Sequence, residues 1–488
     1  MATEEAYLAQ IRRRGWLGRV VGYTRLTGPG YLQSAFTLGS GTAAACLLSG
    51  WAYGYKLLWV QPLAMLLGVI VFAAIAKQTL NSDERPYATF WNRLHPALAL
   101  AWGLSALAAS IIWHFPQYGI ATWSMADLLG HEFGLESSGT WQCRLIIGFV
   151  ILAICIPLSW AYSKRGRPLR IYERLIKITV WGMVIAFGWV AVATGIDWGR
   201  LFKGLFGFYI PNPHTEPEGL WIMLGGLSAA VGINMVFLYP YSLRQRNWGK
   251  EHEGLAHFDL LTGMLVPFAI ASILVIVAVA NARERLGQGE LKSMVDLIPV
   301  LTQQFGTHAS AIVLGLGLFA MGVSSITVQM LAAGFTACEI FGLRPEGWPY
   351  RLCMLFPVIG VAGSVVKLPF TFAVYVSVGM VFFLPAAYIG FMILNNMASY
   401  MGEAMPRGAK RWLWNIGLTL AIGLVTAAGL LTAYKKFQGY LERRAAVKQE
   451  TAAITPPRRS PVATSGAIRT VLPRSCGKGL TLGDGSVS

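Results

Sequence analysis

Residues 225–234 read GGLSAAVGIN, and they lie inside the apolar stretch Leu220–Tyr241, which is long enough to cross a membrane. A second run of small residues, TLGSGT at residues 37–42, lies inside the apolar stretch Thr27–Gly50. Both runs are too rich in Gly and Ser for a continuous helix. They occupy corresponding positions in two halves of the chain, which is typical of an inverted repeat whose broken helices line a cavity. The alternative is that both runs are small-residue faces for close helix packing.

Outward from these runs, the chain holds eleven apolar stretches that can each cross a bilayer core of roughly 30 Å. The pattern therefore predicts an all-α integral membrane protein in which the first ten spans form two sets of five, followed by one extra span. The predicted spans are Thr27–Gly50, Leu57–Gln78, Ala97–Ala121, Leu145–Tyr162, Thr179–Thr194, Leu220–Tyr241, Leu260–Ala280, Ser310–Cys338, Trp348–Val366, Thr371–Met397 and Trp412–Ala433.

The composition agrees with a membrane protein and excludes several other classes. Of the 488 residues, 55% are hydrophobic and 13% are charged, and the mean hydropathy is +0.52; soluble proteins carry about 25% charged residues. The net charge of +17 comes from basic residues between the apolar stretches rather than on one face, so no nucleic-acid partner is expected. The six cysteines are scattered and predict neither a disulfide framework nor a zinc site. Because the chain has no P-loop, H-E-x-x-H or G-x-S-x-G motif, we expect no enzyme and no cofactor.

Lys and Arg residues predict the orientation. With the N-terminus inside the cell, the segments on that side hold 22 of them and the opposite segments hold 8, before the tail. We therefore expect a multi-pass protein of a bacterial-type inner membrane, surrounded by lipid and with a cytoplasmic N-terminus. The predicted parts are a cytoplasmic segment 1–26, repeats 27–196 and 219–398 within a transmembrane domain 27–433, an extra helix 411–433, and a disordered basic tail 434–488. The sequence does not predict the oligomeric state.

Several motifs, in the same order and spacing, resemble those of NRAMP-type divalent metal transporters. They are GPGYL at 28–32, GYKLLWV at 54–60, GVSSIT at 322–327, LPAA at 384–387 and MGE at 401–403. The likeness runs from about Arg25 to Ala433. It implies the LeuT-type fold, five plus five inverted helices with helices 1 and 6 broken, and alternating-access secondary transport of a metal cation.

The chain departs from that family where the family binds its metal. In the sixth helix the family reads A-x-x-M-P-H, whereas residues 229–234 here read AAVGIN. The carbonyl of Ala229 is retained, but Gly232 replaces the Met and Asn234 replaces the His. In the first helix, Gly39 and Thr42 take the places of the Asp and Asn of the family's D-P-G-N.

The family's proton route is altered as well. Its acidic residues in the third helix correspond to His114 and Gln117, and Arg246 matches a basic residue of the route. A histidine inside a span is a candidate proton relay or weak ligand. The alternative for His114 is a neutral imidazole that is hydrogen-bonded to a neighbouring helix.

The resemblance thus implies a binding site of neutral oxygen atoms at the two breaks. The candidate binding residues are Gly39, Ser40, Thr42, Ala229, Gly232, Asn234, Ser324, Ser325 and Ser377, of which Thr42, Ala229 and Asn234 are the candidate metal ligands. The serines can equally be helix-packing hydroxyls. Oxygen ligands suit a hydrated hard ion such as Mg²⁺, whereas selection of Mn²⁺ or Fe²⁺ draws on a thioether or imidazole, and neither is present at the matched positions.

Three functions are compatible with these residues. The leading hypothesis is a secondary transporter that moves an inorganic cation, with possible proton coupling through His114. The first alternative is a transporter of the same fold for a small neutral or organic solute, because no acidic residue lies at either predicted break. The second is a non-transporting receptor.

Overall fold

The structure, a computed structural model, describes residues 2–164, 166–286, 307–366, 376 and 381–454. The chain divides into two compact units, residues 1–435 and 436–488, and each is described by itself. In the second unit the described residues, 436–454, are the end of helix α21 (Gly408–Ile454). Everything that follows concerns the first unit.

The described part of the first unit is helical and contains no β-strand. Its α-helices are α1 (Ala2–Arg12), α2 (Trp16–Leu26), α3 (Pro29–Thr37), α4 (Ser40–Tyr53), α5 (Val60–Leu80), α6 (Pro86–Thr89), α7 (Pro96–Phe133), α8 (Trp141–Ser163), α9 (Arg167–Thr194), α10 (Trp198–Phe206), α11 (Pro217–Ala229), α12 (Ile233–Gln245), α13 (Glu253–Asp259), α14 (Val266–Leu286), α16 (Thr307–Ile340), α17 (Gly347–Cys353), α19 (Leu384–Asn395), α20 (Ala398–Met401) and the first part of α21. A π-helical segment, η5 (Leu260–Leu265), joins α13 to α14.

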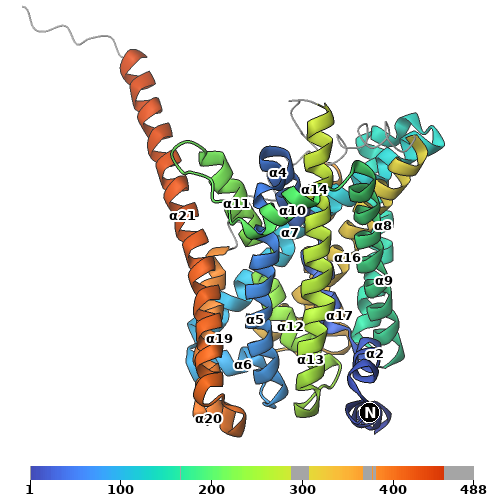
Figure 1. Cartoon of the computed structure of the whole chain (residues 1–488), viewed down its shortest axis with the longest axis vertical. Helices are drawn as coiled ribbons and strands as arrows, with labels where there is room; N and C mark the ends of the chain where they lie inside the picture. The colour runs from blue at the N-terminus through green and yellow to red at the C-terminus, as the bar shows by residue number, and fades with distance from the viewer. Residues whose placement is uncertain (1, 165, 287–306, 367–375, 377–380, 455–488) are drawn as a thin grey trace, which may run out of the picture. The chain divides into compact units, whose positions relative to one another are not determined.

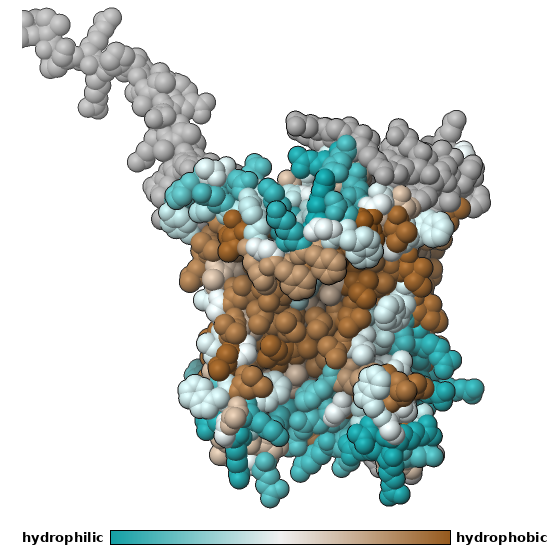
Figure 2. Space-filling view, viewed as in Figure 1, coloured by the Kyte–Doolittle hydropathy of each residue, from teal (hydrophilic) through white to brown (hydrophobic). Residues whose placement is uncertain are grey.

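These helices form a bundle in which segments far apart in the sequence lie side by side. Helix α14 packs against α4, α5 and α9, and the long helices α7 and α16 pack along each other (Figure 1). Apolar side chains form a band across the visible face, and polar side chains gather at its two ends (Figure 2). This distribution is that of a multi-pass membrane protein, because only apolar side chains can face lipid without a cost in free energy.

Eight helical segments within the described residues are long and apolar enough to cross a membrane. They match predicted spans two to eight and eleven. The tenth span, Thr371–Met397, lies partly outside the described residues, which show its last part as α19.

The first and ninth predicted spans are not single α-helices. The first is divided into α3 and α4. The ninth, Trp348–Val366, is the short helix α17 followed by a 3-10 helix, η7 (Phe356–Ser364). Its small residues pack directly on α7: a Cβ atom at Gly360 would lie 2.3 Å from the Cβ of His114, and one at Gly363 would lie 2.0 Å from the carbonyl oxygen of Phe115.

Both predicted helix breaks are present. The first falls at Leu38 and Gly39, between α3 and α4, and the second at residues 230–232, between α11 and α12. Gly39 is needed for its small size, since a Cβ atom there would lie 2.5 Å from Nε2 of Gln117. The packing alternative therefore holds in part: the small residues both interrupt the helices and allow close contacts.

The same argument predicts the effect of a methyl group on α3. A Cβ atom at Gly30 would lie 2.2 Å from the carbonyl oxygen of Asp259, so we expect Gly30→Ala to lower the free energy of unfolding by about 1–3 kcal/mol. The measurement is the thermal unfolding midpoint of the purified protein in detergent. Gly182→Ala on α9 is the matched control, because no atom lies within 4 Å of the added methyl group. Equal midpoints for the two variants would contradict the close packing of α3 on Asp259.

Candidate functional site

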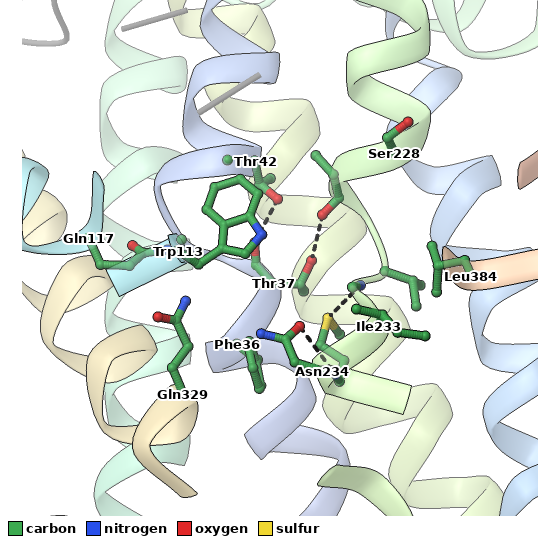
Figure 3. Close-up of a pocket in the computed structure, with 16 residues that line it drawn as sticks. Phe36, Thr37, Thr42, Trp113, Gln117, Ser228, Ile233, Asn234, Gln329 and Leu384 are labelled. Atoms are coloured by element: carbon green, nitrogen blue, oxygen red, sulfur yellow. Dashed lines mark hydrogen bonds between the residues drawn. The ribbon is translucent and has the colours of Figure 1, made fainter. Parts of the chain in front are cut away.

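The two helix breaks face each other across a cavity of about 40 Å³ near the middle of the bundle (Figure 3). A space of this size holds a few water molecules or a small ion. Its described lining comes from both breaks, from α7 and α16, and from the start of α19. The lining residues are Phe36, Thr37, Gly39, Gly41, Thr42, Trp113, Gln117, Ser228, Ala229, Val231, Gly232, Ile233, Asn234, Met235, Gln329 and Leu384.

Side chains satisfy the backbone groups that the first break leaves free. The backbone N–H of Ser40 donates to Oε1 of Gln117 at 3.0 Å, so α7 provides the cap for the start of α4. The hydroxyl of Thr42 donates to the carbonyl of Thr37 at 2.6 Å. Thr42 therefore lies at the first break, where the sequence placed it, whereas Gln117, a proton-path candidate of the third helix, reaches the break from α7; both hold the break in shape.

The two breaks are joined by Thr37. Its hydroxyl lies 2.9 Å from the carbonyl oxygen of Ala230 and 3.3 Å from that of Ala229 (Figure 3). The carbonyl of Ala229, a candidate ligand, is thus turned toward the first break. Sequence reasoning missed Thr37, although it is the first residue of the TLGSGT run.

The second break carries a sulfur atom in its wall. Sδ of Met235 accepts a hydrogen bond from the backbone N–H of Gly232 at 3.2 Å. Asn234 accepts from the N–H of Met235 at 3.1 Å and donates through Nδ2 to the hydroxyl of Ser110 at 3.4 Å. The absence of a thioether at the matched positions holds, and the sulfur in the wall comes from a position that the motif matching did not consider. Position 232 has no sulfur, but Met235, one helical turn later, brings one to it.

The remaining candidates divide into those at the breaks and those away from them. The hydroxyl of Ser325 donates to the carbonyl of Ala35 on α3 at 2.8 Å, whereas that of Ser324 bonds within its own helix, to the carbonyl of Met321. Ser40 contributes its N–H, and its buried hydroxyl has no partner among the described residues. Ser377 lies outside the described residues.

His114 is fully buried on α7, next to the cavity rather than in its wall. Its Nδ1 lies 2.7 Å from Oε1 of Gln329, which lines the cavity, and 3.1 Å from the carbonyl of Ser110. Both partners are acceptors, so Nδ1 carries the hydrogen of these contacts. Nε2 has no partner in the described part of the chain. The imidazole is therefore hydrogen-bonded to a neighbouring helix, α16, and its role as a proton relay stays a prediction.

Arg246 lies away from the cavity, in a buried group of charges at the base of α3. Its guanidinium pairs with Glu173 of α9 at 3.3 Å and donates to the carbonyl of Leu26 at 2.8 Å. Next to it, the carboxylate of Asp259 accepts from the backbone N–H groups of Gly28 (3.1 Å) and Gly30 (2.6 Å). This buried charge cluster caps the start of α3.

Sequence reasoning missed the acids of the charge cluster because it placed the span boundaries too late. Glu173 precedes the predicted span Thr179–Thr194, and Asp259 precedes Leu260–Ala280, yet both are buried. The GPG motif at 28–30 was the available signal. A Cβ atom at Gly28 would lie 2.5 Å from the carboxyl carbon of Glu173, so a larger residue here would displace this carboxylate.

The cavity itself is uncharged. No Asp, Glu, Lys or Arg belongs to its described lining, and no group of three or more His, Cys, Asp or Glu in the described ranges could hold a metal ion. The polar groups that remain are hydroxyl, amide and carbonyl groups and one thioether. Such a site binds a cation only if the ion keeps part of its hydration shell.

Comparison with known proteins agrees with this architecture. The family model described as natural resistance-associated macrophage protein-like (Nramp) matches residues 30–432. The chain is 23% identical over 333 residues to the divalent metal cation transporter MntH of Nostoc sp., a match that covers 67% of this chain and 71% of the relative.

Solved structures share the fold. A manganese transporter of Eremococcus coleocola, solved with an aromatic bis-isothiourea substituted compound, superposes with a TM-score of 0.67 at 16% identity, covering 90% of this chain and 92% of the other. Mhp1, a nucleobase-cation-symport-1 family transporter, gives a TM-score of 0.57 at 12% identity, covering 83% and 92%. The fold is therefore of the LeuT type, as the broken helices indicated. Because the family model covers most of the sequence, the chain belongs to the Nramp family of membrane transporters, and it is not an enzyme.

Proposed function

We propose that this chain is a secondary-active transporter that carries an inorganic divalent cation by alternating access, with the cavity between the two helix breaks as its binding site. The observation that carries the proposal is the meeting of both breaks around one small cavity that holds hydroxyl, amide and carbonyl groups. The matching relatives are divalent metal cation transporters by name, which supports the same substrate class.

The cavity has room for an ion. About 40 Å³ accommodates a partly hydrated ion. The solute alternative retains one argument, which is the absence of charge from the described lining. The receptor alternative has no structural observation in its favour.

We assign the ligand atoms to the second break and to Thr42. The carbonyl of Ala229, the amide oxygen of Asn234 and the hydroxyl of Thr42 are the proposed hard donors, and the sulfur of Met235 is the proposed soft one. In the structure described, each of these atoms already takes part in a hydrogen bond within the protein. An arriving ion would therefore replace these hydrogen bonds with its own contacts. Without an ion, the same hydrogen bonds leave none of the four atoms unpaired.

Proton coupling is proposed to use His114. Gln329 connects this ring to the cavity wall, and Nε2 is the atom available to accept a proton. We assign Arg246 to the charge cluster at the base of α3 and not to a proton route that contacts the cavity. We further propose a bacterial-type inner membrane with the N-terminus in the cytoplasm, which follows from the Lys and Arg distribution.

Metal uptake into proteoliposomes tests the cation site. We expect saturable uptake of Mg²⁺ or Mn²⁺, reduced about tenfold or more by Asn234→Ala and by Thr42→Ala, because losing one ligand of a small site costs about 10–100-fold in affinity. Folded protein that moves none of Mg²⁺, Mn²⁺ or Ca²⁺ would overturn the metal proposal. Uptake of an organic solute would then establish the alternative.

Met235→Leu separates soft from hard ions. We expect this variant to lose Mn²⁺ uptake by about tenfold relative to Mg²⁺ uptake, because only the softer ion gains from a thioether. Met223→Leu is the matched control: Met223 is buried on α11 but does not line the cavity. An unchanged ratio of the two ions in Met235→Leu would show that the sulfur serves only as an acceptor for Gly232.

Internal pH recorded during uptake tests the coupling. We expect acidification in parallel with metal entry, and its loss in His114→Gln while some metal flux remains, since Gln keeps a hydrogen-bonding group but does not accept a proton. His214→Gln, at an exposed loop position, is the control. Acidification that persists in His114→Gln would remove His114 from the proton route.

A further inference from the structure

The N-terminal helix α1 precedes the part of the chain that matches the family, because the family model begins at residue 30. It is nevertheless packed into the bundle. Leu8 is 2% exposed and belongs to the continuous hydrophobic core, and Ile11 is fully buried against α2. A Cβ atom at Gly22 would lie 2.6 Å from the side chain of Ile11, so α2 carries a glycine where α1 crosses it.

Two polar contacts tie α1 to elements far along the chain. The carboxylate of Glu4 pairs at 3.3 Å with Nη2 of Arg246, the residue that directly follows α12. The guanidinium of Arg12 donates to the main-chain carbonyl of Glu251. Figure 1 shows the N-terminus at the same end of the bundle as α2 and α13.

Arg246 links the two broken helices at this end. It follows α12, the second half of the second broken helix, and its Nη2 donates to the carbonyl of Leu26, the last residue of α2, three residues before α3 begins. Lys177 of α9 adds donors to the carbonyl of Thr24 (3.0 Å) and the hydroxyl of Thr27 (2.6 Å) in the same turn. These bonds hold the start of α3 against α9, α12 and α13 at this end of the bundle.

We propose that α1 is a latch that positions Arg246 and keeps this end of the transporter closed. Opening toward this end requires the base of α3 to separate from α12. Helix α1 opposes that motion because Glu4 forms an ion pair with Arg246 and because Leu8 is buried in the hydrophobic core. Helix α1 can detach and bind again because its release leaves the buried charges paired. When α1 leaves, Arg246 keeps Glu173 as its partner and Lys177 stays near Asp259, so no buried charge is left unpaired.

The inference rests on the proposed alternating access but not on the identity of the cargo. Its test is therefore amide hydrogen exchange of the full-length protein in lipid nanodiscs, which needs no substrate. We expect Glu4→Gln to speed exchange about threefold in both α1 and α3, and Leu8→Ser to speed it at least tenfold in both, because the second change removes the apolar anchor. Initial rates of metal uptake, measured in parallel, are expected to change by at least twofold in Leu8→Ser.

Glu251→Gln is the matched control, because it removes an exposed carboxylate at the same end and leaves the main-chain carbonyl that Arg12 contacts. Its exchange should equal that of the unmodified protein. Faster exchange in α1 with unchanged exchange in α3 would overturn the latch, since α1 would then dock without holding α3. Unchanged exchange in α1 of Leu8→Ser would also overturn it, because Leu8 would not be its anchor. If no cargo is transported but α3 responds to both variants, the latch stands and the proposed function fails.

Discussion

The rest of the structure depends on the need to satisfy the backbone groups that two broken helices expose inside a water-poor bundle. An unpaired N–H or C=O group in such surroundings costs several kcal/mol, so each one needs a partner. Gln117 supplies an acceptor to the start of α4, Thr37 a donor to the end of α11, and Met235 an acceptor to Gly232. The cavity is the space that these partners surround, and its polarity follows from them.

Charge is kept out of the centre and gathered at one end. The described lining of the cavity is neutral, whereas the side chains of Glu173, Arg246 and Asp259 lie buried at the base of α3, with the half-buried Lys177 beside them. Buried charges are tolerated only when paired, and here each has a partner in another element or in the backbone of the GPG turn. The cluster therefore fixes the position of α3, and a cation that enters the neutral cavity meets no fixed charge of opposite sign in its described wall.

Close contacts at glycine explain why the motif positions carry so little side-chain volume. Gly28 and Gly30 allow Glu173 and Asp259 to approach the start of α3, and Gly360 and Gly363 allow η7 to lie directly on α7. The ninth span, which contains Gly360 and Gly363, is a short α-helix followed by a 3-10 helix rather than one α-helix. Hydropathy predicted its length but carries no information on whether an apolar segment winds as an α-helix or a 3-10 helix.

The sequence by itself determined the membrane class, the positions of most spans, the two breaks and the family, because hydropathy and runs of small residues are local properties. It also placed Thr42, Ala229 and Asn234 at the breaks by matching motif positions, whereas Gln117, matched to the third helix, is brought to the first break by the tertiary structure. Only the tertiary structure decided which side chains reach the cavity from elsewhere. Met235 brings a sulfur to Gly232 from one helical turn away, an outcome that depends on how α12 is turned in the bundle and not on residue order.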